Sequence, residues 1–149
     1  MKKFAIICIF LSVVLSSCKY EEGPFISVRE AEARMVGVWE LGKVYKNGIE
    51  QTETVTGLSA NRPGSYYTFY YEGMLSVTAI VNGNIRESNQ GFWNFQNNEK
   101  EIKVEFQLPG EDYLYEAEIK RLTMSELRYE YTDSDGNLWR FEMYTRSHY

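Results

Sequence analysis

After residue 35 the chain alternates apolar and polar residues, the pattern of β-strands with one buried face. The clearest stretch is EIKVEFQL at residues 101–108, where Ile102 and Val104 share one face and Lys103 and Glu105 share the other. The same period of two predicts further strands at residues 38–45, 65–71, 74–81, 91–96, 113–120, 126–131 and 138–146.

Short turn sequences separate most of these strands: Asn47-Gly48, Glu72-Gly73, Asn82-Gly83, Asn97-Asn98, Pro109-Gly110 and Asp135-Gly136. Asn-Gly and Asp-Gly supply the positive φ angles of tight hairpins, so neighbouring strands are predicted to be antiparallel. Closing such a sheet hides one face of every strand and removes the edges. We therefore predict an all-β fold, an up-and-down antiparallel β-barrel of eight or nine strands. A two-sheet sandwich is the alternative.

A short helix is predicted ahead of the first strand. Residues 27–35 read SVREAEARM, with Ser27 as the expected N-cap and Glu30 three residues later, as in a capping box. Residues 50–61 and the following NRPGS fit neither pattern and are expected to form a longer loop near one mouth of the barrel.

The first residues have the composition of a secretory signal. Lys2 and Lys3 precede an apolar run from Phe4 to Leu15. The run is shorter than the roughly 20 apolar residues that a membrane-spanning helix needs. It ends at Leu15-Ser16-Ser17-Cys18, where small residues precede a cysteine.

This tetrapeptide resembles a bacterial lipobox. The resemblance implies that the Cys18 sulfur receives a diacylglycerol, that cleavage falls just before it and that the new amine is acylated. Two or more acyl chains hold a protein firmly to a bilayer. The expected organisation is a lipoprotein signal peptide at 1–17, a lipidated flexible tether at 18–27 and the barrel domain at 28–149. An ordinary secretory signal or a retained membrane helix are the alternatives.

The charged residues after the cysteine bear on location. The stretch CKYEEG loosely resembles the acidic export signal of surface lipoproteins in Bacteroidota. Lys19 stands where an aspartate marks inner-membrane retention in other Gram-negative bacteria. The resemblance implies an outer-membrane lipoprotein that faces the cell surface or the periplasm. Alternatively, Glu21 and Glu22 belong to a solvated spacer.

The net charge and the number of cysteines limit which classes of partner the domain is expected to bind. Removing residues 1–17 leaves 132 residues, which suits one domain, and loss of Lys2 and Lys3 changes the formal net charge from −5 to −7. An acidic domain without a Lys/Arg cluster is a poor nucleic-acid binder and has no basic patch for anionic lipid. Cys8 leaves with the signal and Cys18 is consumed by lipid, so no thiol remains for a disulfide or a metal.

A second resemblance follows the predicted helix. Gly37-Val38-Trp39 resembles the G-x-W motif on the first strand of lipocalins, and residues 119–144 are similar to small lipocalin-like lipoproteins of Bacteroidota. The resemblance covers roughly residues 35–146 and implies a barrel with a central cavity, usually for a small apolar molecule. It also implies that Trp39 plugs the closed end and that an arginine of the last strand, Arg140 or Arg146, packs on it. The family's T-D-Y turn is not matched, since Ser134 follows Thr132-Asp133.

The predicted inward faces are rich in tyrosine. A tyrosine ring with its hydroxyl suits a mainly apolar pocket that has a few polar groups. These side chains either fill the barrel or line a ligand cavity, and both readings remain open at this point. The predicted ligand-binding residues are Tyr67, Tyr71, Tyr113, Tyr115, Tyr129 and Tyr131.

Enzymatic and metal chemistry have little support in the sequence. The single histidine, His148, lies next to the C-terminus and is poorly placed as a general base. The stretch DSDGN at residues 133–137 lacks the spacing of an EF-hand and predicts a hairpin turn. The carboxylates fall on outward faces beside Lys or Arg, as expected for a solvated exterior: Glu101, Glu105, Glu116, Glu118, Glu126, Glu130 and Glu142.

The sequence therefore predicts a non-enzymatic outer-membrane lipoprotein with no cofactor and no metal. Its lipid anchor makes the membrane a partner, and its barrel is expected to bind a small apolar or amphipathic molecule. The alternative is an interaction or structural module of a cell-envelope complex whose barrel is filled by side chains.

Overall fold

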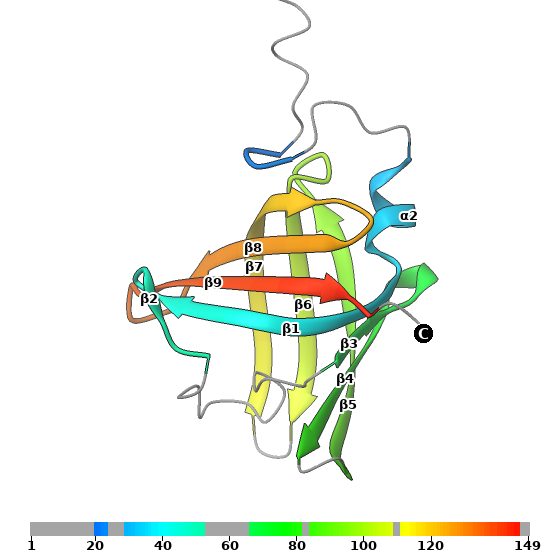
Figure 1. The fold of residues 1–149 in the computed structure, drawn as a ribbon, viewed down its shortest axis with the longest axis vertical. Helices are drawn as coiled ribbons and strands as arrows, with labels where there is room; N and C mark the ends of the chain where they lie inside the picture. Colours follow the sequence, from blue (N-terminus) through cyan, green and yellow to red (C-terminus); the bar gives the residue numbers. More distant parts are fainter. Residues whose placement is uncertain (1–19, 24–28, 53–65, 82–83, 109–110, 147–149) are drawn as a thin grey trace, which may run out of the picture.

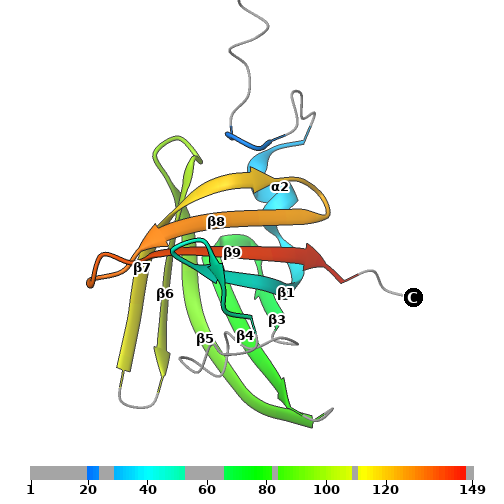
Figure 2. The ribbon, with the colours of Figure 1, turned by 60° about the vertical axis from the view of Figure 1, so that its left-hand side comes forward.

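The computed structural model describes residues 20–23, 29–52, 66–81, 84–108 and 111–146 of the 149-residue chain. Figures 1 and 2 show strands wrapped around one interior, with the short helix beside the start of the first strand. The elements are α2 (Ala31–Met35), β1 (Gly37–Lys46), β2 (Ile49–Glu50), β3 (Tyr66–Phe69), η2 (Tyr71–Gly73), β4 (Met74–Val81), β5 (Asn84–Gln96), β6 (Glu101–Leu108), β7 (Glu111–Leu122), β8 (Glu126–Thr132) and β9 (Leu138–Thr145).

Pairing of the first strand with the last closes the sheet. The described residues form nine strands in the order β2-β1-β3-β4-β5-β6-β7-β8-β9, and β1 also pairs with β9. The short β2 pairs with β1 beside this ring, and every pairing is antiparallel. The predicted up-and-down barrel is confirmed, and the sandwich alternative is wrong.

The connections alternate between two ends of the barrel. We call the helix end the one that carries α2 and the β3–β4, β5–β6 and β7–β8 connections. The hairpin end carries the β1–β2, β4–β5, β6–β7 and β8–β9 connections. In Figure 1 the β4–β5 and β6–β7 hairpins point downward, away from α2 and from residues 20–23 at the top.

Most strand positions agree closely with the prediction, except at the β3–β4 connection and at β5, which begins at Asn84 and not at the predicted residue 91. Strands β4 and β6 have the predicted bounds, whereas β3 ends at Phe69 because the chain turns immediately afterwards. Glu72 and Gly73 have φ angles of 66° and 79°, and the Tyr70 N–H donates to the Met74 carbonyl at 2.9 Å. Tyr71 therefore lies in η2 with 59% of its surface exposed, and its predicted inward position is wrong.

Other predicted turns also show the expected left-handed backbone. Asn47 and Gly48 have φ angles of 50° and 79°, and Gly136 has a φ of 82°. The turn after β5 extends the left-handed region through three residues, Asn97, Asn98 and Glu99. The Asn82-Gly83 and Pro109-Gly110 turns lie outside the described residues.

The helix is shorter than the sequence indicates. Glu30 has an extended backbone (φ −59°, ψ 153°) and is the N-cap, without a side-chain capping hydrogen bond. The predicted capping box is therefore wrong at Glu30, and Ser27 lies outside the described residues. The helix ends when Val36 becomes extended, and Gly37, with a φ of 147°, turns the chain into β1.

The core occupies the barrel interior and continues to the helix end. Alternate residues of β6, β7, β8 and β9 are buried, as the period of two predicts. The same cluster includes Ala31 and Met35 of α2 and, ahead of the helix, Tyr20. The largest fully buried side chains are Trp39, Tyr67, Tyr129, Met35, Leu75, Ile102, Ile119, Leu122, Leu127, Met143 and Val44.

Trp39 is the clearest test of this packing. It has no exposed surface, and its indole N–H donates to the Met35 carbonyl at 2.7 Å, which ties β1 to α2. We expect Trp39→Ala to lower the free energy of unfolding by about 3–5 kcal/mol, measured by chemical denaturation.

Phe92→Ala is the matched control, because Phe92 is 64% exposed on the outside of β5. We expect it to change stability by less than about 0.5 kcal/mol. A loss under about 1 kcal/mol for Trp39→Ala would contradict its contribution to the core at the helix end.

Candidate functional site

The interior wall of β7, β8 and β9 is a cluster of stacked aromatic rings. The Tyr115 ring lies 4.7 Å from Tyr131 and 6.0 Å from Tyr129, centroid to centroid, with nearly parallel planes. Phe141 of β9 stacks on Tyr129 at 5.1 Å. The hydroxyl oxygens of Tyr115 and Tyr129 are 3.2 Å apart and form a hydrogen bond. The wall therefore combines apolar ring faces with a small polar centre.

These interior phenols are neutral at physiological pH. Burial raises the pKa of Tyr67 and Tyr129 well above the ordinary value of 10, and neighbouring tyrosines raise it further. Burial also raises the pKa of Tyr115, although its hydrogen bond with Tyr129 opposes the shift. The hydroxyls of these three tyrosines are thus protonated and available as hydrogen-bond donors and acceptors.

The structure brings four of the six predicted tyrosines together inside the barrel. Tyr67 and Tyr129 are buried, and Tyr115 and Tyr131 are partly buried against the core. Tyr71 lies outside, in η2, and the side chain of Tyr113 lies outside the described residues. Ligand binding by the interior tyrosines stays a prediction.

The helix end carries a buried arginine that the sequence did not single out. Arg34 of α2 donates from Nη1 to the Leu122 carbonyl at 2.6 Å, and its guanidinium lies 5.5 Å from the centre of the Tyr20 ring. Burial raises the pKa of Tyr20 to about 12, with Arg34 opposing the shift. Arg34 of α2 thus contacts both Tyr20 and the end of β7.

The predicted packing of Arg140 on Trp39 is wrong. Thr145 is the β9 residue paired with Trp39, whereas Arg140 pairs with Tyr45, further along the strand. Arg140 points outward and binds Glu22. The other candidate, Arg146, places its guanidinium 4.8 Å from the centre of the Tyr66 ring.

Residues 20–23, predicted to be part of a flexible tether, lie against the barrel. Tyr20 is only 3% exposed, and the Glu22 N–H donates to the Lys120 carbonyl at 2.8 Å. The Arg121 guanidinium donates to the Glu22 carbonyl at 2.6 Å, and Gly23 N–H closes a turn on Tyr20. We call this docked stretch the leader.

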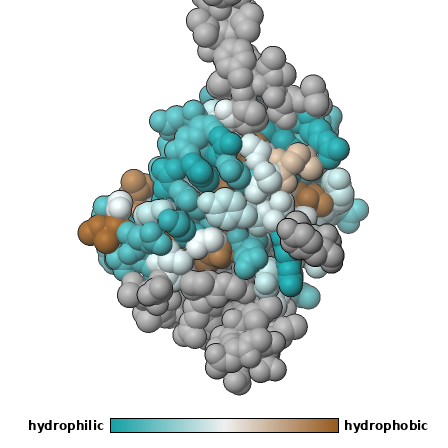
Figure 3. Space-filling view, in the orientation of Figure 1, coloured by the Kyte–Doolittle hydropathy of each residue, from teal (hydrophilic) through white to brown (hydrophobic). Residues whose placement is uncertain are grey.

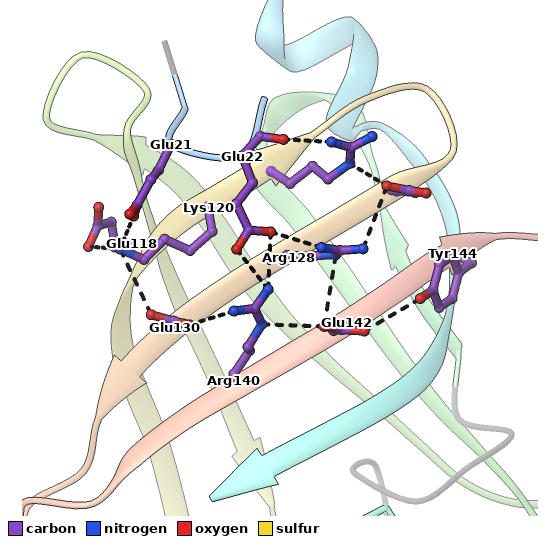
Figure 4. Close-up of polar contacts among 11 residues, drawn as sticks. Glu21, Glu22, Glu118, Lys120, Arg128, Glu130, Arg140, Glu142 and Tyr144 are labelled. Atoms are coloured by element: carbon purple, nitrogen blue, oxygen red, sulfur yellow. Dashed lines mark hydrogen bonds and ion pairs between the residues drawn. The ribbon is translucent and has the colours of Figure 1, made fainter. Parts of the chain in front are cut away.

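The Glu22 side chain enters a charge network on the outside of β7, β8 and β9 (Figure 4). Its carboxylate accepts hydrogen bonds from Arg128 at 2.8 Å and from Arg140 at 2.8 and 3.0 Å. Glu130 and Glu142 lie 3.3 Å from Arg140, so each arginine sits among carboxylates. Glu21 pairs with Lys120 at 2.9 Å.

Electrostatics favour the ionised form of Glu22. Burial alone raises the pKa of this carboxyl, but the hydrogen bonds and charges of Arg128 and Arg140 lower it below the ordinary 4.5. Burial lowers the pKa of Arg140, and the hydrogen bond and charge of Glu22 more than reverse that. These ion pairs hold the leader against β8 and β9. We call the network of Glu22, Arg128, Arg140, Glu130 and Glu142 the electrostatic lock.

Sequence reasoning missed this lock because it treated the outward charges as solvated. The side chain of Glu142 is only 13% exposed and that of Glu130 only 17%. A signal was present, since Arg128 opposes Glu142 and Glu130 opposes Arg140 across β8 and β9. Such alternation of charge on one face indicates an ordered network. Its partner, the leader, lies about 100 positions earlier in the chain and gave no comparable signal.

The DSDGN stretch forms the predicted hairpin turn. Asp133 accepts hydrogen bonds from the backbone of Asp135 and Asn137, at 3.0 and 2.8 Å, and from the Trp139 indole N–H at 2.8 Å. The Trp139 bond is the main cause that lowers the pKa of Asp133 to about 2. Across the described ranges, no cluster of three or more His, Cys, Asp or Glu side chains is arranged to hold a metal ion.

Two parts of the exterior contrast with each other. The face over β1, β8 and β9 is mainly hydrophilic, with apolar side chains gathered near β2 (Figure 3). Around the β3–β4 connection, by contrast, Tyr70, Tyr71, Met74 and Phe92 are all exposed. Three of them border a groove of about 470 Å³, whose lining is Tyr70, Met74, Leu75, Ser76, Gln90, Gly91 and Phe92.

Because the ionised Glu22 carboxylate helps to hold the leader, the free energy of unfolding is expected to fall at acid pH. Because the folded-state pKa of Glu22 lies below its ordinary 4.5, its stabilising effect is complete above that pH and is lost as pH falls through the folded value. We expect Glu22→Gln to cost about 1 kcal/mol near pH 7, with the difference from the unmodified protein shrinking below pH 4. Chemical denaturation across this range measures both.

Glu21→Gln is the control, since the Glu21 side chain is 70% exposed and pairs with Lys120 at the surface. It should leave both the stability and its pH dependence almost unchanged. Equal behaviour of the two variants would contradict the lock at Glu22.

Comparisons with known proteins bear on the fold. No family model and no curated protein matches the chain. An uncharacterized protein from Bacteroides eggerthii aligns over 75% of this chain and 99% of its own, with a TM-score of 0.56 and 13% identity. A lipocalin-like protein from Bacteroides uniformis aligns over 76% and 99%, with a TM-score of 0.52 and 16% identity.

Insecticyanin from the tobacco hornworm Manduca sexta is also similar in structure. It aligns over 75% of this chain and 61% of its own, with a TM-score of 0.52 and 8% identity. Identities this low show the fold alone. The closed eight-stranded antiparallel ring, the additional β2 and the short helix before β1 match these neighbours, and the fold of this chain is lipocalin-like.

Proposed function

We propose that this protein is an outer-membrane lipoprotein that binds one small apolar or amphipathic molecule inside its barrel. The observation that carries the proposal is the interior wall of stacked, neutral aromatic rings around the Tyr115–Tyr129 hydrogen bond. Ring faces suit an apolar ligand body, and the paired hydroxyls suit a single polar group. The lipocalin-like resemblance points to the same class of ligand.

Anchoring rests on the lipobox-like sequence at residues 15–18. Cys18 lies outside the described residues, and so does the signal segment before it. Within the described part of the chain, no helix has the length and apolar character needed to cross a membrane. We infer attachment through lipid at Cys18, on the surface or periplasmic side of the outer membrane.

A binding role without catalysis is favoured by the placement of the carboxylates. The described glutamates of β8 and β9 point outward into ion pairs with Arg128 and Arg140, away from the interior tyrosines. An acid and a base facing one substrate pocket are what glycoside hydrolysis needs. His148 lies outside the described residues.

A second candidate function is an interaction module of the cell envelope. The exposed apolar residues Tyr70, Tyr71, Met74 and Phe92 favour it, because such patches mark contact sites when they are contiguous. This role requires no ligand, and the barrel interior then serves only as a core. Occupancy of the barrel distinguishes the two functions.

Lipid attachment is tested by Cys18→Ser. We expect this variant to leave the membrane fraction for the soluble fraction, because it lacks the acyl chains that hold the protein to the bilayer. Cys8→Ser is the matched control, since that cysteine lies in the segment that is removed. Unchanged membrane partitioning of Cys18→Ser, measured by fractionation and immunoblotting, would rule out the anchor.

Ligand binding is tested by mass spectrometry of small molecules extracted from the Cys18→Ser protein, purified from its own host without detergent. We expect one apolar or amphipathic compound at near-stoichiometric amount. Tyr115→Phe removes an interior hydroxyl and should weaken rebinding of that compound by roughly three- to tenfold in Kd.

Tyr144→Phe is the control for this substitution, because Tyr144 is exposed on the outer face of β9. It should leave the Kd unchanged. An empty protein, with no shift in melting temperature across a panel of lipids, would favour the interaction module and a filled barrel.

A further inference from the structure

We propose that the protein lies on its membrane in one fixed orientation, with the helix end of the barrel against the bilayer and the hairpin end facing the aqueous phase. The inference rests on the lipid anchor of the proposed function. The new element is the docked leader. Because residues 20–23 are held against the barrel, a lipid on Cys18 is attached close to one end of it and not through a long flexible tether.

The first step is the length of chain between anchor and barrel. Cys18 precedes Tyr20 by two residues, and two residues span at most about 7 Å. Tyr20 is buried, and Glu22 is held by the Lys120 carbonyl and by Arg121, Arg128 and Arg140. The Cα atom of the acylated cysteine is therefore at most about 7 Å from the Cα atom of Tyr20.

The second step is where that place lies. Tyr20 packs beside Arg34 of α2, and Arg34 binds the Leu122 carbonyl at the end of β7. The Lys100 carbonyl, in the β5–β6 turn, accepts the N–H of Ile119, directly before Lys120. These contacts place Tyr20 and the leader backbone at the helix end of β7, above the β6–β7 hairpin in Figure 1, while the Glu22 side chain reaches across the outer face to Arg128 and Arg140.

The third step is the distance to the other end. Strand β7 runs from Lys120 back to Glu111, and nine steps of about 3.4 Å separate these residues by about 30 Å. A bilayer surface that meets the leader is thus far from the β6–β7 hairpin. The Debye length near physiological salt is only about 8 Å, so the membrane surface charge is screened there.

The test uses full-length, lipidated protein in vesicles whose headgroups carry a fluorescence acceptor. With Cys8 removed and Cys18 acylated, one introduced cysteine is the sole thiol available for a donor dye. Lys100→Cys places the dye at the helix end, and Leu114→Cys places it on β7 toward the hairpin end, where Leu114 is 61% exposed. We expect several-fold higher energy transfer from position 100 than from position 114.

A linker variant separates fixed docking from chance contact. Twelve Gly/Ser residues inserted after Lys19 leave the leader and barrel unchanged but lengthen the tether by an average of about 20 Å. We expect transfer from position 100 to fall and the difference between the two positions to shrink. This variant keeps every docking residue, so the barrel stays folded.

Different results would overturn the proposed function and the proposed orientation. Intact-mass measurement that finds no lipid on the protein would overturn the proposed lipoprotein function and this inference with it. Equal transfer from both positions, or higher transfer from position 114, in protein shown to be lipidated would overturn the orientation alone.

Discussion

Closure of the barrel through β1 is the constraint on which the rest of the structure depends. β1 pairs with β3 near Trp39 and with β9 along most of its length, so it joins the first and last parts of the sheet. The β1–β9 register shifts between Leu41 and Lys43. Gly42 lies at that point, and a Cβ there would lie 2.5 Å from a Tyr144 ring carbon. The irregularity thus lets the ring of a β9 residue cover the β1 backbone where the barrel closes. Without this pairing, β8 and β9 would not present the outer face that receives the leader.

The interior shows how a barrel accommodates buried phenol hydroxyls by pairing them with each other. A buried hydroxyl without a partner is costly, and Tyr115 and Tyr129 avoid much of that cost by bonding to each other. The stacked rings of Tyr131 and Phe141 surround this pair with apolar surface. Aliphatic residues would fill the same space without any polar requirement. The choice of tyrosine therefore gives the wall a limited capacity for hydrogen bonding, which is the property that an amphipathic ligand would use.

The parts of the fold that follow from local rules were predictable, and those that depend on distant partners were not. The alternation in EIKVEFQL reproduces β6 because burial of Ile102 and Val104 requires only that one face point inward. Asn47-Gly48 gave a turn because its backbone preference is local. Tyr71 was misplaced because the turn closed by the Tyr70–Met74 backbone hydrogen bond begins two residues before the predicted Glu72-Gly73 turn, so β3 ends at Phe69. The outward face of Arg140 was foreseeable, but its partner Glu22 comes from a segment with no periodic pattern of its own.

The leader also constrains how its acidic residues can be used. In the folded protein the Glu22 carboxylate is held by two arginines, whereas Glu21 keeps most of its side chain in solvent. A factor that recognises both carboxylates as an export signal must therefore bind before the leader docks, or must displace Glu22 from Arg128 and Arg140. Docking in turn requires β7, β8 and β9 to be paired, because Lys120, Arg128 and Arg140 come from these three strands. Binding of Glu22 by a partner therefore competes with docking of the leader on the folded barrel.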